Sequence, residues 1–189
     1  MKNHIAAAVA VAALALSASA QAEGLRPVLG ASVTGGGKTL VNVQYSDGST
    51  QKIRSGGFVH LFGGAEYEFT DSFALQGNIG FHVDDTTAKN GSIKFKRWPV
   101  ELIALWKLEP NMRLGVGVRK ATGAKITSSG AASNLGSQSF DSKAGLILQG
   151  EYLFAQNWSG LLRFVREDYT VSGTKVQGNH AGLGISYRF

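Results

Sequence analysis

Apolar and polar residues alternate one by one along most of this chain, and no other feature of the sequence limits its fold as strongly. In the segment FALQGNIGFHV, Gln76, Asn78 and His82 hold even positions. The large apolar residues hold odd positions, namely Phe73, Leu75, Ile79, Phe81 and Val83. Successive side chains of a β-strand point to opposite faces, so this pattern predicts a strand with one apolar and one polar face. The pattern recurs in eight segments, which we expect to form eight strands: 26–35, 58–69, 73–83, 98–108, 112–120, 143–154, 158–167 and 182–189.

The connections between these segments differ in length. Residues 70–72, 109–111 and 155–157 form three tight connections, and the other four are longer and rich in Gly, Ser, Lys and Thr. Short turns at one end and long loops at the other are typical of outer-membrane barrels. The mean hydropathy of −0.02 excludes a bundle of membrane helices but not a barrel, because alternation averages to neutral. The sequence therefore predicts an all-β fold, an eight-stranded antiparallel up-and-down transmembrane β-barrel.

A water-soluble barrel of the lipocalin kind would show the same alternation with its apolar face turned inward. Two features favour the membrane barrel. Aromatic residues gather at the strand ends, where an aromatic girdle belongs. Trp98 and Trp106 also stand eight residue steps apart. In a tilted strand this spacing gives about 20 Å of height, which is close to the apolar band of such barrels.

The beginning of the chain has the form of a secretory signal peptide. Lys2 gives a positive start, an apolar run follows, and Ala20 and Ala22 suit a cleavage site. We expect residues 1–22 to be the signal peptide and residues 23–189 to be the barrel. The sequence contains no cysteine, so it can form neither a disulfide nor a thiolate metal site.

The chain ends on GLGISYRF, in which Leu183, Ile185, Tyr187 and Phe189 share one face up to the last residue. Together with the leader and the eight alternating segments, this ending resembles the small outer-membrane β-barrel proteins of Gram-negative bacteria, of the OmpX, OmpA-barrel and opacity-protein type. The resemblance covers the whole mature chain. It implies export through the periplasm into the cell outer membrane. It also implies that the barrel-assembly machinery reads these four residues as an assembly signal.

Hairpin geometry predicts which polar residues meet inside the barrel. If the apolar residues flanking each tight turn face each other, His60 lies opposite His82 and Glu101 lies opposite Arg119. Eight strands leave an interior just wide enough for side chains, so inward charges must be paired. We interpret this interior as a salt-bridged plug, with a narrow water or ion path as the alternative. The expected lumen network comprises His60, Glu66, Glu68, His82, Glu101, Lys107, Arg113, Arg119, Glu151, Arg163 and Arg188.

Some of these polar residues have the chemistry of a metal site or of a catalytic site. His60, His82 and the nearby Asp84 have ligand chemistry, but histidines on a polar face are ordinary lining, and we expect no metal and no cofactor. Small barrels that deacylate lipid A show His-x-Ser along one strand, and none of the 4 histidines here has Ser two residues on. We therefore expect a non-enzymatic structural or surface-interaction protein. A small pore for ions or small solutes is the alternative, and a lipid A-modifying enzyme comes third.

Basic residues gather at the strand ends away from the short turns. Lys94, Lys96 and Lys120 continue the lipid-facing parity, and we expect them to contact the phosphates of lipopolysaccharide within the outer-membrane lipid. Pro99 cannot donate a ladder hydrogen bond and predicts a bulge. A bulge in that strand would reverse the parity of Lys94 and Lys96.

Two of the long connections carry signals of their own. The first, KTLVNVQYSDGSTQKIRS, contains the two-residue turn signal Asp47-Gly48, which predicts a protruding hairpin able to bind an extracellular partner through its edge. The third, TGAKITSSGAASNLGSQS, is small and polar and predicts an irregular loop. The formal net charge of +6 suits nucleic acid or anionic lipid, and export argues against nucleic acid.

Overall fold

The described part of the chain consists of β-strands joined by turns and loops, with one short 3-10 turn. The signal peptide predicted over 1–22 and the turn residue Asp47 lie outside the residues that the computed structural model describes, which are 24–44, 48, 50–88, 91–130 and 132–189. The elements are β1 Leu25–Gly36, β2 Thr39–Gln44, β3 Thr50–Arg54, β4 Phe58–Thr70, β5 Phe73–Ala88, β6 Gly91–Glu109, β7 Met112–Gly130, the 3-10 turn η2 Ser133–Leu135, β8 Gln138–Ser142, β9 Gly145–Leu153, β10 Trp158–Arg166, β11 Asp168–Val171, β12 Thr174–Gln177 and β13 His180–Arg188.

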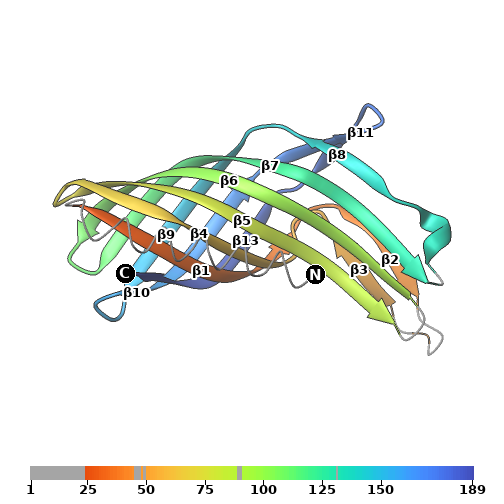
Figure 1. Cartoon of the computed structure of the whole chain (residues 1–189), viewed down its shortest axis with the longest axis horizontal. Coiled ribbons are helices and arrows are strands. Elements are labelled where there is room, and N and C mark those ends of the chain that lie inside the picture. Colours follow the sequence, from red (N-terminus) through yellow and green to blue (C-terminus); the bar gives the residue numbers. More distant parts are fainter. Residues whose placement is uncertain (1–23, 45–47, 49, 89–90, 131) are drawn as a thin grey trace, which may run out of the picture.

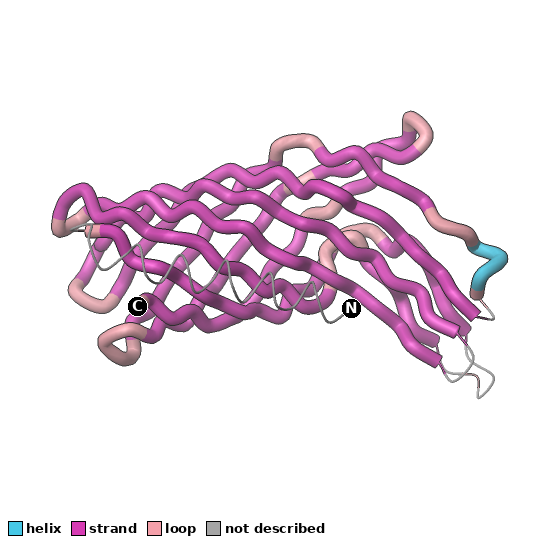
Figure 2. Tube along the Cα trace, viewed as in Figure 1, coloured by secondary structure: helices cyan, strands magenta, loops and turns pink. Residues whose placement is uncertain are grey.

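Eight of these strands close into one barrel (Figures 1 and 2). Antiparallel pairing runs through β1, β4, β5, β6, β7, β9, β10 and β13, and β13 pairs back with β1. The predicted fold class is therefore confirmed. The short turns and the C-terminus lie at one end of the barrel, which we call the turn end. The opposite end, where the longest strands reach furthest, is the projecting end.

The strand register matches the sequence inside the barrel and departs from it beside the turns. Two predicted cross-strand pairs are confirmed: His60 with His82, and Glu101 with Arg119. Beside the first turn, however, Phe73 pairs with Thr70 rather than with Phe69, because the register shifts by one residue there. A similar shift lies beside the second turn, between Lys107 and Glu109. The inward pairs keep their predicted partners because both shifts lie outside them.

The barrel wall has two unequal sides. Strands β5, β6 and β7 have 16, 19 and 19 residues and form what we call the long wall. Strands β9, β10 and β13 have 9 residues each and form the short wall. The prediction of an irregular third long loop is wrong over much of its length. There β7 continues to Gly130 and β8 follows the 3-10 turn, because Ala124, Ile126 and Phe140 bury their side chains at the projecting end.

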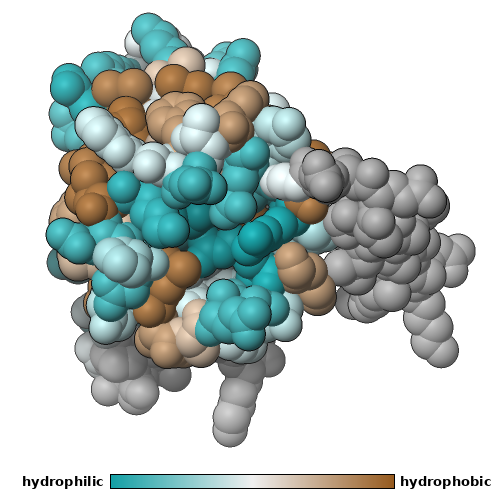
Figure 3. Space-filling model, turned by 90° about the vertical axis from the view of Figure 1, so that its left-hand side faces the viewer, coloured by the Kyte–Doolittle hydropathy of each residue, from teal (hydrophilic) through white to brown (hydrophobic). Residues whose placement is uncertain are grey.

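Apolar side chains cover the outside of the barrel and polar side chains fill the inside. Trp98 and Trp106 are 49% and 60% exposed, whereas Glu66 and Arg119 are 0% and 1% exposed. Seen from the turn end, polar residues occupy the middle of the barrel and apolar residues surround them (Figure 3). This arrangement is that of a membrane barrel and the reverse of a lipocalin. Among the described residues, no helix is long and apolar enough to cross a membrane.

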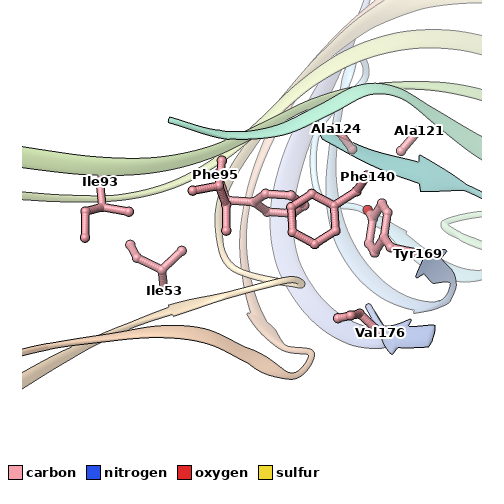
Figure 4. Close-up of a cluster of buried hydrophobic side chains, with 9 residues drawn as sticks. Ile53, Ile93, Phe95, Ala121, Ala124, Phe140, Tyr169 and Val176 are labelled. Atoms are coloured by element: carbon pink, nitrogen blue, oxygen red, sulfur yellow. The ribbon is translucent and has the colours of Figure 1, made fainter. Parts of the chain in front are cut away.

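A compact apolar cluster, which we call the cap cluster, lies at the projecting end (Figure 4). Strands β2 and β3 pair as the predicted hairpin. The hairpin packs against the long wall through Ile53, which is fully buried, rather than standing free. The cluster consists of Ile53, Ile93, Phe95, Ala121, Ala124, Ile126, Phe140, Tyr169 and Val176.

Candidate functional site

The layer of the lumen nearest the turn end is built around Arg113 on β7. Its guanidinium donates to Glu66 on β4 (Nη1–Oε1 2.7 Å, Nη2–Oε2 2.9 Å) and to Glu151 on β9 (Nε–Oε2 2.9 Å, Nη2–Oε2 2.6 Å). Arg188 on β13 donates to Glu151 Oε2 at 3.1 Å and to Ser159 Oγ on β10 at 2.5 Å. Charge-assisted bonds of this length are strong, and they join opposite walls of the barrel.

The middle layer is organised by Glu101 on β6. Arg163 Nη1 on β10 lies 2.9 Å from Glu101 Oε2, and Arg119 Nη1 on β7 lies 3.4 Å from Oε1. Arg163 Nε also donates to Gln149 Oε1 at 2.8 Å. Gln149 Nε2 in turn donates to Glu151 Oε1 at 2.6 Å, so the middle layer and the turn-end layer form one network.

The layer nearest the projecting end surrounds Glu167, which follows β10. Arg119 Nε lies 3.2 Å from Glu167 Oε2, while Arg97 Nε and His180 Nδ1 lie 4.0 Å and 3.6 Å from Oε1. The hydroxyl of Tyr169 donates to Oε1 at 2.8 Å. Arg119 belongs to this layer and to the middle one, so the polar network is continuous from the turn end to the cap cluster.

The charges inside the barrel balance. Among the described residues, the buried ionised side chains are five arginines and five carboxylates, since the buried histidines count as neutral. A balanced set of paired charges is the form in which charges tolerate burial, and here the pairing is by ion pairs as well as hydrogen bonds, since the guanidinium of Arg119 has no hydrogen-bond partner among the described residues. The two groups are Arg97, Arg113, Arg119, Arg163 and Arg188 against Glu66, Asp84, Glu101, Glu151 and Glu167.

Two residues predicted for the lumen network lie at its edge instead. Lys107 is exposed at the turn end, and Glu68 is partly exposed and pairs with Arg26 at 3.4 Å. Both line an open vestibule of about 420 Å³ whose deep side is formed by Arg113 and Arg188. Their inward parity is as expected, but they stand too close to the turns to be covered by the barrel.

The network also contains members that the sequence did not assign to it. Arg97 lies in the basic stretch KFKRW, and continuing the parity of the strand past Pro99 would have found it. His180 has the same parity as Ser186 and Arg188 but precedes the predicted start of that strand at 182, whereas Tyr169 lies in a short strand without an alternation signal. The unassigned members are Arg97, Gln149, Glu167, Tyr169 and His180.

The histidine rings form a row of tilted and edge-on contacts. Ring centroids of His60 and His82 lie 5.1 Å apart, and those of His82 and His180 lie 5.2 Å apart. Arg97 Nη2, which can only donate, lies 3.0 Å from His82 Nε2, so the lone pair of that nitrogen is engaged. Among the described residues, no group of three His, Cys, Asp or Glu side chains is arranged to hold a metal ion.

The hairpin over the projecting end is fixed by polar contacts as well as by the cap cluster. Ser55 Oγ donates to the carbonyl oxygen of Gln177 at 2.6 Å, and Arg54 N donates to Asp84 Oδ2 at 2.7 Å. The carboxylate of Asp84 therefore holds the backbone of the hairpin at Arg54. Burial raises the pKa of Tyr169, so its hydroxyl stays protonated and keeps its donor role beneath the hairpin.

The predicted rim lysines all lie on the outer surface. Lys94, Lys96 and Lys120 are exposed, and Lys94 Nζ lies 3.8 Å from Asp85 Oδ2. Lys94 and Lys96 stand on the part of β6 that rises beyond Trp98, whereas Lys120 stands on β7.

The irregularity expected near Pro99 lies on the partner strand. The register of β6 with β7 shifts between Lys96 and Trp98, and β7 carries the extra residue at Gly123, whose φ is 59°. Strand β6 itself keeps its alternation through Pro99. Lys94 and Lys96 therefore keep the outward parity expected for them, because the bulge belongs to β7.

The residues of the predicted assembly signal lie on the outer face of β13. Leu183, Ile185 and Phe189 are 67%, 49% and 47% exposed, and Tyr187 packs edge-on against Phe189 with ring centroids 4.8 Å apart. Phe189 N donates to the carbonyl oxygen of Pro27 at 3.0 Å, so the last residue pairs with β1 and does not fray.

The closed barrel, its apolar exterior and its polar lumen define an integral membrane β-barrel protein. Comparison with known families agrees, since the family model "Outer membrane protein beta-barrel domain" matches residues 6–189. The chain belongs to this family of the outer membrane.

Solved structures of low sequence identity resemble the chain. Ail, the attachment invasion locus protein of Yersinia pestis, in complex with the heparin analogue sucrose octasulfate, is 15% identical. The match covers 87% of this chain and 97% of that one, with a TM-score of 0.47. Neisserial surface protein A is 12% identical, with coverage of 88% and 98% and a TM-score of 0.49. No curated protein sequence matches the chain.

Proposed function

We propose that this chain is a non-enzymatic outer-membrane protein whose barrel is a closed support and whose projecting end makes contacts outside the cell. The observation that carries the proposal is a lumen obstructed twice. The charged network fills the barrel between the walls, and the cap cluster covers its projecting end. As part of the same proposal, residues 1–22 direct export and are removed, and the barrel-assembly machinery reads the ending from Leu183 to Phe189.

The energetics of the network support a structural role. Removing one partner of a buried ion pair typically costs about 3–5 kcal/mol, because the other charge is left uncompensated. Moving several such side chains aside to open a path would incur that cost repeatedly. The balanced charge of the lumen also gives no preference for either sign of ion.

The surface that remains for contacts is the outer part of the long wall with the hairpin beside it. Strands β5, β6 and β7 rise beyond the apolar belt there and expose Lys94 and Lys96. In this proposal Lys94, Lys96 and Lys120 contact lipopolysaccharide phosphates. The hairpin and the loops of the projecting end are offered to an extracellular partner.

A small pore is the second candidate, and two observations favour it. The vestibule at the turn end reaches inward as far as Arg113 and Arg188. His60 Nε2 and Arg163 Nη2 are buried without a hydrogen-bond partner among the described residues, and water entering the lumen would satisfy both. A thread of water through the network would make the plug permeable.

Conductance of the refolded protein in a planar bilayer separates the two candidates. Protein shown to be folded by its unboiled gel mobility should give no reproducible current steps. Steps that change with Glu101→Ala, but not with Lys107→Ala at the exposed turn end, would establish a pore and overturn the closed-barrel proposal. A second measurement tests for an enzyme. Expression of the protein in a Gram-negative host should leave the mass of the host's lipid A unchanged, and a shifted mass would establish an enzyme.

A further inference from the structure

The short wall carries an apolar groove on its outer surface. This groove has a volume of about 600 Å³ and runs across β7, β9, β10, β13 and β1 near the projecting end. Its sides are the outward residues Val116, Leu146, Leu148 and Phe164, which are 57%, 57%, 47% and 50% exposed. A groove of this kind on the belt of a membrane barrel faces lipid chains.

The groove exists because large and small residues meet across neighbouring strands. Phe164 on β10 pairs with Ala181 on β13, and Ala181 pairs with Gly35 on β1. A methyl group added at Gly35 would meet no atom within 4 Å. The hollow beside Phe164 therefore follows from two small residues in one row of the barrel.

Basic side chains lie at the edge of this groove, and Arg166 is one of its lining residues. Arg166 is the last residue of β10. It lies two residues beyond Phe164, towards the projecting end, and on the same outward face. Lys120 lies two residues beyond Val118 on the outward face of β7, and Val118 pairs with Leu146 in the groove wall. Among the described residues, no carboxylate lies within ion-pair distance of Arg166 or Lys120.

A second, polar pocket adjoins the groove. It has a volume of about 640 Å³ and is lined by Gly37, Lys38, Lys175, Gln177 and Asn179, and the last of these also lines the groove. Lys38 is exposed, while Lys175 pairs with Asp168 at 2.9 Å. Apolar walls below and basic side chains above follow each other over a few residues, because the strands of the short wall end at this height.

We propose that this face of the short wall binds a phosphorylated lipid of the outer leaflet, the lipid A portion of lipopolysaccharide. One acyl chain lies along the groove over Gly35 and Ala181. A phosphate is held by Arg166, with Lys120 on one side and Lys38 on the other. Guanidinium and ammonium groups at the height of the headgroups bind phosphate through charge-assisted hydrogen bonds. The inference rests on the proposed contact of Lys120 with lipopolysaccharide, and the site lies outside the lumen, so it is independent of whether the lumen conducts.

The chain offers matched variants for a test. Gly35→Leu fills the groove, and Gly77→Leu is its control. Gly77 also has open space around an added side chain, but it lies on β5, away from the groove. Arg166→Gln removes the central cation, and Lys52→Gln on the hairpin removes an equally exposed charge elsewhere. Unboiled gel mobility shows whether each variant is folded.

The measurement is retention of lipid by the purified barrel in native mass spectrometry. The probes are bisphosphorylated lipid A, the same lipid A without phosphates, a zwitterionic phospholipid and inorganic phosphate. We expect one bisphosphorylated lipid A per barrel, about fivefold weaker retention in Arg166→Gln, and loss of retention in Gly35→Leu. The two controls should behave as the unmodified protein.

Three results would overturn the proposal. Equal retention of lipid A with and without phosphates would remove the role of the cations. Unchanged retention in folded Gly35→Leu would remove the role of the groove. Binding of inorganic phosphate that competes fully with lipid A would make this a simple anion site.

Discussion

Arg113 shows how much of this barrel depends on single charged side chains. It is buried, and its guanidinium holds the carboxylates of Glu66 and Glu151 from two other strands. Lys107 is its direct cross-strand partner, yet Lys107 is exposed at the turn end. The two cations thus stand in the same row of the barrel, but Arg113 is buried between two carboxylates and Lys107 is exposed.

Arg113→Met should therefore destabilise the protein by about 3–5 kcal/mol, because two buried carboxylates lose their shared cation. The matched change Lys107→Met should cost less than about 1 kcal/mol, since an exposed charge contributes little. Urea unfolding followed by tryptophan fluorescence in lipid vesicles measures both. Equal effects of the two changes would show that burial in the lumen does not set the strength of the pairs.

At the residue scale, the sequence predicts well which face of a strand a side chain occupies, and predicts poorly which side chains meet inside the barrel. Alternation placed Glu66, Glu101 and Arg163 on the inward face because side-chain direction in a strand has a fixed period. It did not identify Arg97 or His180 as members of the network. Arg97 lies within β6 beyond Pro99 and His180 is the first residue of β13, so both fall outside the predicted segments, and only the closed barrel brings them over Glu167.

At the scale of elements, the hairpin of β2 and β3 is the piece whose place most depends on tertiary packing. Asp47-Gly48 was enough to predict the hairpin, but not that it folds across the end of the barrel. The same holds for β8, since Phe140 is an isolated apolar residue in a polar stretch and its partners Phe95 and Tyr169 come from distant strands. Local sequence cannot report such contacts.

Ile53→Asp should release the hairpin while leaving the barrel closed, because it buries a charge in the cap cluster without a partner. Amide hydrogen exchange in β2 and β3 should accelerate by about tenfold or more, the equivalent of ~1.4 kcal/mol of lost docking. Exchange in β9 and β10 should not change. Lys52→Asp, one residue away and exposed, is the control; release of the hairpin by that change too would contradict a role for the cap cluster.

At the scale of the whole molecule, the sequence predicts closure, strand number and the apolar exterior. Eight alternating segments with alternating connection lengths leave little else. The inequality of the walls was not predicted, because polar strand beyond the membrane has the composition of a loop. Strand β7 continues as strand through KITSSG only because β6 and β8 supply its hydrogen bonds.

The two obstructions in the lumen act in series, which makes a prediction for the whole barrel. A variant with residues 39–54 replaced by a short turn should stay silent in a planar bilayer, and so should Glu101→Ala combined with Arg119→Ala. The two changes combined with Arg113→Ala should give current steps, because the cap cluster, the middle layer and the turn-end layer are then all breached. Current steps from either variant alone would show that the obstruction removed in that variant closes the barrel without help from the other.

The inequality of the walls also gives the molecule a direction within the membrane plane. On the side of β5, β6 and β7 the strands are long, whereas on the side of β9, β10 and β13 they are short and only the strands β8, β11 and β12, of 4 or 5 residues each, continue beyond them. A neighbour arriving from one side therefore meets a longer polar wall than a neighbour arriving from the other. Lateral contacts between such barrels in a membrane therefore depend on which side of each barrel faces its neighbour.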